Sequence, residues 1–224
     1  MKDRIDLICQ QMMSLPLFLG MSSNDISNLL TTFPIAYHVY GDGKVVAQAD
    51  TACNSLIFLV RGKMRISTTA DDHGYTIEEL FEAPNVVQPE RLFGLTQRYS
   101  RTFKSVSKCS LLRLDKRDVI SLTSNSEVFR LNVLNLLCTT TQKLQRITCE
   151  VSPSGIRQKI FSFVKNRCVR PAGRKVVNIG MVRLGHEIGE SRLNVSRELK
   201  AMHREGLIEQ KKKMFVIPAL ERLS

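Results

Sequence analysis

The sequence has no uninterrupted apolar run near the roughly 18 residues that a membrane helix requires. Its first residues, MKDRIDLICQQMM, are charged from the start and lack the apolar core of a signal peptide. We therefore expect a cytoplasmic protein that does not engage a membrane.

Closely spaced cysteines are also missing, since none of the six forms a CxxC pair. Their wide spacing argues against a zinc site and against a disulfide framework, and it favours reduced, mostly buried thiols. The six are Cys9, Cys53, Cys109, Cys138, Cys149 and Cys168. The common signatures of catalysis are absent as well: there is no glycine-rich phosphate loop with its lysine, no HExxH and no GxSxG. An enzyme is therefore the least favoured class of protein.

Negative charge is scarce in the last third of the chain. From Ser154 to the end there are 16 Lys and Arg residues against 6 Asp and Glu, a balance of +10 out of the total net charge of +12. A small basic module on a nearly neutral body is typical of a nucleic-acid-binding protein. The alternative is a basic solvated surface that aids solubility.

The first half of the chain predicts two helices followed by antiparallel sheet. Residues 4–13 and 23–31 have helical apolar spacing, and Ser22 or Ser23 can cap the second. Between about residues 33 and 114, short β-rich runs alternate with turn signals, as in SLIFLVRGKMRIS around Arg61–Gly62 and in ADDHGYTIEELF, with a turn at 71–74. KCSLLRL predicts a further strand. Such spacing indicates a sandwich or barrel.

Residues 126–150 form the longest predicted helix. Along it a seam recurs at alternating spacings of three and four, which is typical of a short coiled coil. The seam consists of Leu134, Leu137, Thr141, Leu144, Thr148 and Val151. Self-association through this seam is favoured, and packing of the same face on its own domain is the alternative. VSPSG at 151–155 marks the expected domain boundary.

The last domain predicts a helix, a turn, a second helix and a basic hairpin. A helix near 155–167 is expected to bury Ile156, Ile160, Phe163 and Val164, and RPAGRK predicts a turn. VVNIG predicts a short strand and VRLGHEIG a short helix, before LIEQKKKMFVIP closes the chain as a hairpin with lysines at its tip.

GESRLNVSRELKAMHREGLI, residues 189–208, predicts a DNA-recognition helix from about 192 to 205. Ser191 is a good N-cap and Gly206 a good terminator. Val195, Leu199 and Met202 are expected to face inward, whereas Arg192, Leu193, Ser196 and Arg197 fall on the exposed side of the first turns. An arginine there can pair with guanine, and the tip lysines Lys211, Lys212 and Lys213 would contact phosphate without reading sequence.

These motifs together resemble the CRP/FNR family of bacterial transcription regulators across almost the whole chain. LGHEIGESRLNVSRELKAMHREGLI resembles the family's helix-turn-helix, and SLIFLVRGKMRI with DDHGYTIEELF resembles its β-roll. The resemblance implies an α+β fold with a jelly-roll-like antiparallel β-roll at 1–125, a dimerisation helix and hinge at 126–152 and a winged helix-turn-helix at 153–224. It further implies a homodimer on a palindromic promoter site of double-stranded DNA, with RNA polymerase as the additional partner that activation would need.

The resemblance also implies DNA-contacting residues. Arg192 and Arg197 match the family's base-contacting arginines, but Leu193 stands where a glutamate is common, so we expect a different preferred half-site with apolar contact to a thymine methyl. The predicted DNA-binding set is Ser191, Arg192, Leu193, Asn194, Ser196, Arg197, Lys200, Lys211, Lys212 and Lys213. The predicted dimerisation set is Leu134, Leu137, Thr141, Leu144 and Thr148.

The family's effector pocket would lie in NVVQPERLFGLTQRYSRTF. Members that bind cyclic AMP have Gly-Glu where this chain has Pro89–Glu90, and their Arg-Ser pair is displaced here, with Arg101 following Ser100. Proline removes an N–H that a phosphate could use, so cyclic AMP is disfavoured. Glu90, Arg98, Ser100 and Arg101 are the candidate contacts to another anionic effector, and a reshaped or empty pocket is the alternative.

Other cofactors are disfavoured too. Only Cys9 lies where iron–sulfur members carry closely spaced cysteines. His38 and His73 are candidate haem ligands by their position only, while His186 and His203 belong to the DNA-binding module. No metal site and no cofactor is predicted. The leading hypothesis is thus a dimeric DNA-binding regulator, and the alternative is a ligand-binding module that controls a partner protein.

Overall fold

The computed structural model describes residues 2–149 and 153–223, with side chains for residues 8–146 and 153–223. It contains two compact units. The first comprises Met1–Met64 and Phe81–Thr148, and the second comprises Arg65–Leu80 and Cys149–Ser224. This division differs from the predicted one, because the hairpin at 65–80 lies with the C-terminal unit and not with the roll.

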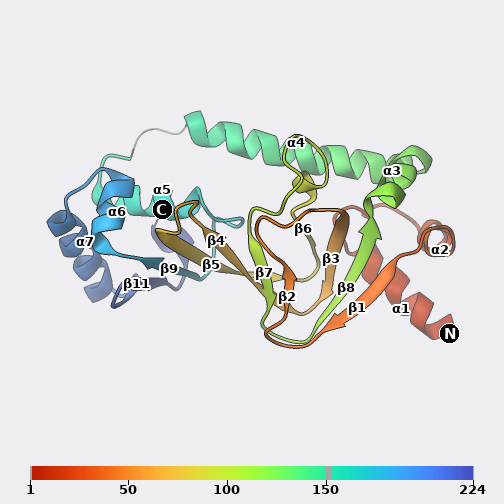
Figure 1. Cartoon of the computed structure of the whole chain (residues 1–224), viewed down its shortest axis with the longest axis horizontal. Helices are drawn as coiled ribbons and strands as arrows, with labels where there is room; N and C mark the ends of the chain where they lie inside the picture. The colour runs from red at the N-terminus through yellow and green to blue at the C-terminus, as the bar shows by residue number, and fades with distance from the viewer. Residues whose placement is uncertain (1, 150–152, 224) are drawn as a thin grey trace. The chain divides into compact units, whose positions relative to one another are not determined.

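The N-terminal unit combines short strands with helices at both ends (Figure 1). Its helices are α1 (Lys2–Met13), α2 (Ser23–Thr32), α3 (Lys116–Asn125) and α4 (Glu127–Cys149). Its strands are β1 (Ala36–Tyr40), β2 (Val45–Ala47), β3 (Ser55–Arg61), β6 (Asn85–Val87), β7 (Thr102–Ser105) and β8 (Cys109–Asp115), with a 3₁₀ turn at Pro89–Arg91. The two N-terminal helices and the β-rich middle confirm the predicted pattern.

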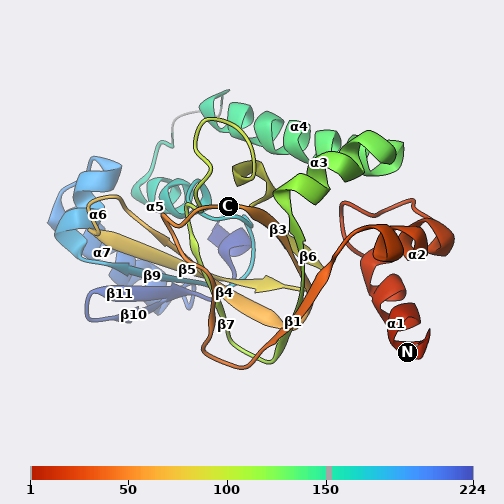
Figure 2. The same cartoon turned by 45° about the vertical axis from the view of Figure 1, so that its right-hand side comes forward.

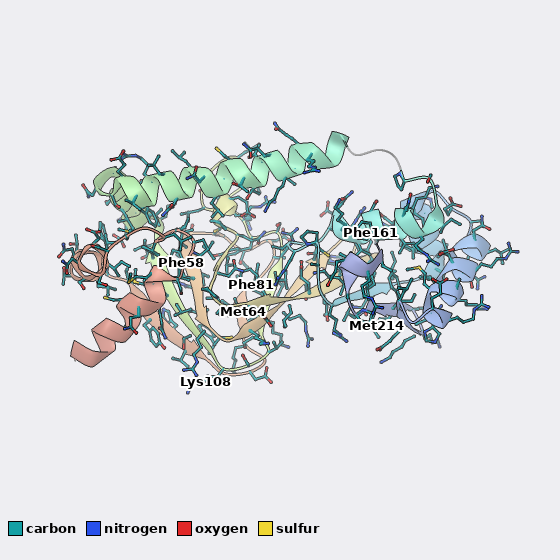
Figure 3. The ribbon with its side chains drawn as sticks, turned by 180° about the vertical axis from the view of Figure 1, so that it is seen from behind. Phe58, Met64, Phe81, Lys108, Phe161 and Met214 are labelled. Carbon is teal, nitrogen blue, oxygen red and sulfur yellow. The ribbon has the colours of Figure 1, made fainter. Side chains whose placement is uncertain are left out.

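The roll is an antiparallel sheet in the order β1-β8-β3-β6, with β2 paired to β7. The central strand β3 has five successive buried residues, from Ser55 to Leu59. Phe18 packs between Phe58 and Phe129, with ring centroids 5.3 and 5.4 Å away, so the chain segment after α1 and the start of α4 share one core. Figure 3 shows Phe58 in the interior of this unit.

Two local features of the roll follow from the sequence. Gly62 has φ +100°, and a Cβ there would lie 2.5 Å from the Lys108 carbonyl oxygen, so only glycine fits the turn between β3 and β4. Ser22 caps α2 as expected, and its hydroxyl accepts a hydrogen bond from the Asp25 N–H. Helix α3 was not predicted.

The C-terminal unit combines helices with short antiparallel strands. Its elements are α5 (Ile156–Lys165), β9 (Lys175–Ile179), α6 (Met181–Ile188), α7 (Arg192–Arg204), β10 (Glu209–Lys211), β11 (Met214–Ile217) and a 3₁₀ turn at Leu220–Leu223. The order helix, strand, helix, helix and hairpin confirms the predicted winged helix-turn-helix. Ile156 is only partly buried, so its predicted burial was wrong, because it occupies the first turn of α5 at the edge of the core.

The hairpin of β4 (Lys63–Thr69) and β5 (Tyr75–Glu82) extends the sheet of this unit. Within the unit the strands follow the order β10-β11-β9-β5-β4, and Figure 2 shows β11, β9, β5 and β4 side by side. Strand β5 pairs with β9 in antiparallel register from Tyr75 opposite Ile179 to Glu79 opposite Lys175. Ile77 is 1% exposed and belongs to the same core as Val177, so the hairpin is an integral part of the domain.

Candidate nucleic-acid interface

The turn between α6 and α7 is fixed by two glycines. Gly189 ends α6 in the left-handed region with φ 65°, where glycine carries no steric penalty. A Cβ on Gly185 would lie 2.6 Å from the Glu190 carbonyl oxygen, so the turn can close over α6 only because residue 185 has no side chain. The Glu190 N–H donates to the Gly185 carbonyl at 2.8 Å. The backbone of the turn therefore packs directly on α6.

The start of α7 is held by an N-cap and by polar contacts of the preceding residue, Glu190. The Ser191 hydroxyl accepts from the Asn194 N–H at 3.1 Å, which confirms Ser191 as the N-cap. Lys159 of α5 donates to the Glu190 carboxylate at 2.6 Å and lowers the pKa of that carboxyl group. The Asn194 amide is half-buried and lies 3.5 Å from the same carboxylate. Asn194 is thus oriented toward the turn.

Helix α7 divides into the two predicted faces. Val195, Leu199 and Met202 are buried in the core, as expected from their spacing. On the opposite side Arg192, Leu193 and Arg197 are exposed, and Leu193 is 71% exposed. Among the described residues, Arg192 and Arg197 take part in none of the ion pairs, unlike the domain's paired cations Arg157, Lys159, Arg167, Lys175 and Arg183. A large apolar side chain and two unengaged arginines therefore project together from the first turns of α7.

Arg157 of α5 forms ion pairs with the C-terminal half of α7. Arg157 donates from Nε to Glu198 and from its two terminal nitrogens to both oxygens of Glu205, each at 2.8 Å. Arg157 lowers the pKa of Glu205, and the two carboxylates raise the pKa of Arg157. Bidentate pairing fixes direction as well as distance, so α7 is anchored at its C-terminal half while its N-terminal half stays accessible.

A groove of about 740 Å³ opens between α6, the start of α7 and the β10–β11 hairpin. The three predicted wing lysines, 211–213, are exposed on its rim, and Lys213 has a positive φ of 57° at the hairpin tip. The apolar part of the lining includes Met181, Met214 and Phe215, and its charged part includes Arg183 and Arg192. Ser196 is half-buried on α7, and Lys200 is exposed one turn further along it. The groove therefore joins the predicted recognition helix to the predicted wing.

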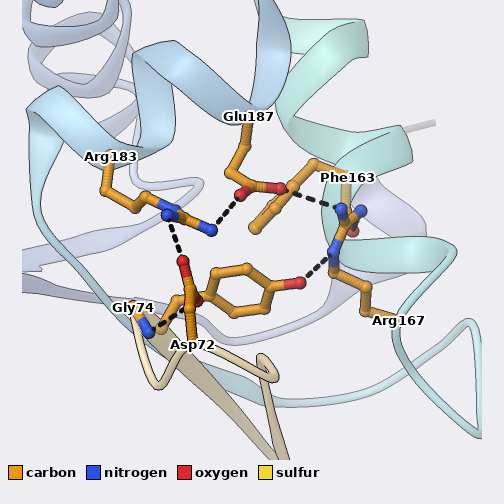
Figure 4. A network of polar contacts seen from close by, with 7 residues as sticks. Asp72, Gly74, Phe163, Arg167, Arg183 and Glu187 are labelled. Carbon is orange, nitrogen blue, oxygen red and sulfur yellow. Dashed lines mark hydrogen bonds and ion pairs between the residues drawn. The ribbon is translucent and has the colours of Figure 1, made fainter.

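Arg183 is a groove residue that the sequence did not single out. Its Nη1 donates to Asp72 of the β4–β5 hairpin at 2.6 Å and its Nη2 to Glu187 at 2.7 Å (Figure 4). Glu187 also accepts from Arg167, whose Nε donates to the Tyr75 hydroxyl at 2.6 Å. The Gly74 N–H and the Arg183 guanidinium lower the pKa of Asp72, so this carboxylate is charged at neutral pH.

The candidate effector residues lie in different local environments. The Gln88 side chain is buried, donates to the Ser100 hydroxyl at 2.6 Å and accepts from the Ser100 N–H at 3.1 Å. Arg98 is exposed and donates to the Asp50 carbonyl oxygen, while Glu90 is exposed on the 3₁₀ turn and Arg101 is half-buried. Ser100 is thus engaged by Gln88, a residue that the sequence did not single out.

The histidines are dispersed. His38 and His73 are exposed on β1 and in the β4–β5 turn, His186 lines the groove, and the His203 Nδ1 lies 3.0 Å from the Ile208 carbonyl oxygen. Within residues 2–149 and 153–223, no group of three metal-binding side chains occurs. In that same part of the chain, no helix combines the length and the apolar character of a membrane span.

The predicted dimerisation seam lies along α4 in the N-terminal unit. Leu134 and Leu144 are 51% and 61% exposed, Thr141 is exposed and Leu137 is half-buried. The Thr148 side chain and Val151 lie outside the described residues. An exposed leucine at each of two seam positions leaves an apolar stripe on α4 that its own unit does not cover.

Compared by sequence, the chain matches no protein-family model and no curated protein. Its structure is similar to the catabolite activator protein of Thermus thermophilus, at 20% identity over 93% of this chain and 96% of that one, with a TM-score of 0.53. It is also similar to a protein of Eubacterium rectale assigned to the CRP/FNR family of transcriptional regulators, at 13% identity over 94% and 96% of the two chains, with a TM-score of 0.56. The sensor domain of the regulator DNR from Pseudomonas aeruginosa matches 69% of this chain over 99% of its own length, at 17% identity and a TM-score of 0.53. The chain therefore has the α+β fold of the CRP/FNR transcription regulators, with both the roll and the winged helix-turn-helix.

Proposed function

We propose that the chain is a sequence-specific DNA-binding transcription regulator that acts as a homodimer on a palindromic promoter site. The observation that carries the proposal is the exposed first part of α7, where Leu193 and Arg197 are exposed and Arg192 lines a groove that also includes the wing lysines. In a helix-turn-helix, these are the positions that meet base edges in the major groove. The fold shared with known regulators agrees with this role.

The three side chains would contact bases in two different ways. Arg192 and Arg197 can each donate two hydrogen bonds to O6 and N7 of guanine. Leu193 has no polar group, so it offers only apolar contact, for which the thymine methyl is the matching surface. The preferred half-site should accordingly contain guanines flanking a position where thymine is favoured.

The wing supplies affinity without sequence information. Lys211, Lys212 and Lys213 are exposed at the hairpin tip, and Lys200 is exposed on α7. Such side chains contact phosphates and release counterions, so binding should weaken steeply as salt rises.

Dimerisation through α4 completes the proposal. The exposed leucines of the seam, Leu134 and Leu144, give the helix an apolar stripe that a second copy can cover. Two copies would present two α7 helices to half-sites about one helical turn apart.

Cyclic AMP is not the effector under this proposal. Pro89 offers no N–H, and the Gln88 side chain already makes two hydrogen bonds to Ser100, where the phosphate contact of a cyclic nucleotide would be needed. Control of a partner protein in place of DNA would leave the exposed arginines of α7 without a role.

The test is selection of bound duplexes from a random DNA pool by the purified full chain without added ligand. Enrichment of a palindrome with half-sites about one helical turn apart supports a dimeric regulator. Recovery of sequences no different from the input pool, at low as well as at moderate salt, contradicts it.

A further inference from the structure

The β4–β5 hairpin brings an acidic tip to the predicted DNA face. Its turn holds Asp71 and Asp72, and the Asp72 Oδ2 lies 2.6 Å from Nη1 of Arg183. Arg183 lines the groove between α6, α7 and the wing. A cation that could contact a phosphate is thus already paired with a carboxylate from a segment about 110 residues earlier in the chain.

Asp72 is held in position independently of the arginine. Its Oδ1 accepts from the Gly74 N–H at 3.0 Å, which leaves Oδ2 for Arg183. The base of the hairpin is fixed by the β5–β9 register and by the buried Glu79, which accepts from Lys175 and from two backbone N–H groups, those of residues 169 and 170. The hairpin tip is therefore a rigid support for the carboxylate.

Arg183 lies flat against this turn because residue 74 has no side chain. A Cβ on Gly74 would lie 3.0 Å from the Arg183 Cζ and 3.2 Å from its Nε. The other terminal nitrogen, Nη2, pairs with Glu187 on the same helix. Loss of Asp72 would therefore free Nη1 of the guanidinium, while Glu187 still pairs with Nη2 and keeps the side chain near the groove.

From this geometry we propose that Asp72 is an intramolecular competitor of DNA phosphate for Arg183. The inference rests on the proposed DNA-binding function and adds a regulatory contact to it. The hairpin strands continue at both ends into the N-terminal unit, at residues 64/65 and 80/81. Loss of the Asp72–Arg183 pair would release Arg183 and strengthen DNA binding.

The test compares Asp72→Asn with Asp71→Asn in the full chain. Both changes remove one negative charge at neighbouring exposed positions, but only Asp72 pairs with Arg183. Asparagine can still accept the Gly74 hydrogen bond, so the turn is preserved. We expect Asp72→Asn to bind a random-sequence duplex about two- to fivefold more tightly than Asp71→Asn, the size of effect that one partly exposed ion pair gives. The salt dependence should steepen by about 0.9 for each additional phosphate contact.

Two further variants make the result specific. In an Arg183→Gln background the advantage of Asp72→Asn over Asp71→Asn should vanish, because the competitor has lost its target. Gly74→Ala should raise affinity without any change of charge, because the added methyl group would lie 3.0 Å from the Arg183 Cζ and 3.1 Å from the Asp72 Oδ1 and so loosen their pair.

Equal affinities of the Asp72→Asn and Asp71→Asn proteins, or an advantage that persists without Arg183, would overturn the inference while leaving the proposed function intact. Failure of every variant, and of the unchanged chain, to bind duplex DNA would overturn the proposed function and the inference with it.

Discussion

Lys175 and Glu79 form an ion pair in which Nζ and Oε2 are 2.8 Å apart and both side chains are 2% exposed. The two residues lie opposite each other on β9 and β5. The carboxylate also accepts from the backbone N–H groups of Val169 and Arg170, so it is fully engaged. This pair joins the early hairpin to the interior of the winged domain.

Removing one partner should be costly. Lys175→Met leaves the Glu79 carboxylate buried without its cation, which we expect to destabilise the C-terminal unit by about 3–5 kcal/mol. Urea unfolding of the full chain measures the effect. Lys63→Met is the matched control, because the Lys63–Glu82 pair at the base of the same hairpin is about half exposed and is worth roughly 0–1 kcal/mol. A loss for Lys175→Met no greater than for the control would contradict a buried charge pair.

Acid should weaken the attachment of α7. Arg157 lowers the pKa of Glu205, so the contribution of this pair to the free energy of unfolding is present above the ordinary carboxyl pKa of 4.5 and is lost as pH falls below it. Chemical denaturation between about pH 3 and 6 measures this dependence. The Arg157→Ala variant should be less stable at neutral pH and should lose less stability on acidification. An acid dependence identical to that of the unchanged chain would show that the pair does not contribute.

A charge within the α4 seam should prevent dimerisation. Leu134→Glu and Leu144→Glu each place a carboxylate on the apolar stripe, and we expect either variant to sediment as a monomer where the unchanged chain sediments as a dimer. Gln142→Glu introduces the same side chain at an exposed position outside the seam and should leave the dimer intact. If the variant with both leucines replaced still forms dimers, the dimer interface does not lie on the α4 seam.

Local signals in the sequence were sufficient for most of the fold. Ser191 and Gly206 delimit α7 to within one residue, and the spacing of its buried residues gave its inward face. The turn at 71–74 and the break between two β-rich pieces at Arg61–Gly62 were also evident, because turns depend on residues close together in the chain.

Pairing over long distances was not evident. Nothing near Glu79 indicates that its strand pairs with one that begins 96 residues later, and Lys175 looked like part of a turn in RPAGRK. Helix α3 was missed because its apolar residues, with Val119 and Leu122 buried, are few. Arg183 was missed for the same reason as Lys175, since its partner Asp72 is close only in the folded chain.

The central claim is that α7 reads bases, and Arg197→Ala tests it most directly. The measurement is the ratio of affinities for the selected palindrome and for a scrambled duplex of equal length, at one fixed salt concentration. We expect Arg197→Ala to lose about 1–3 kcal/mol of discrimination per half-site with little change in binding to the scrambled duplex, whereas Lys212→Ala should weaken binding to both duplexes alike. An unchanged ratio for Arg197→Ala would contradict base reading by α7.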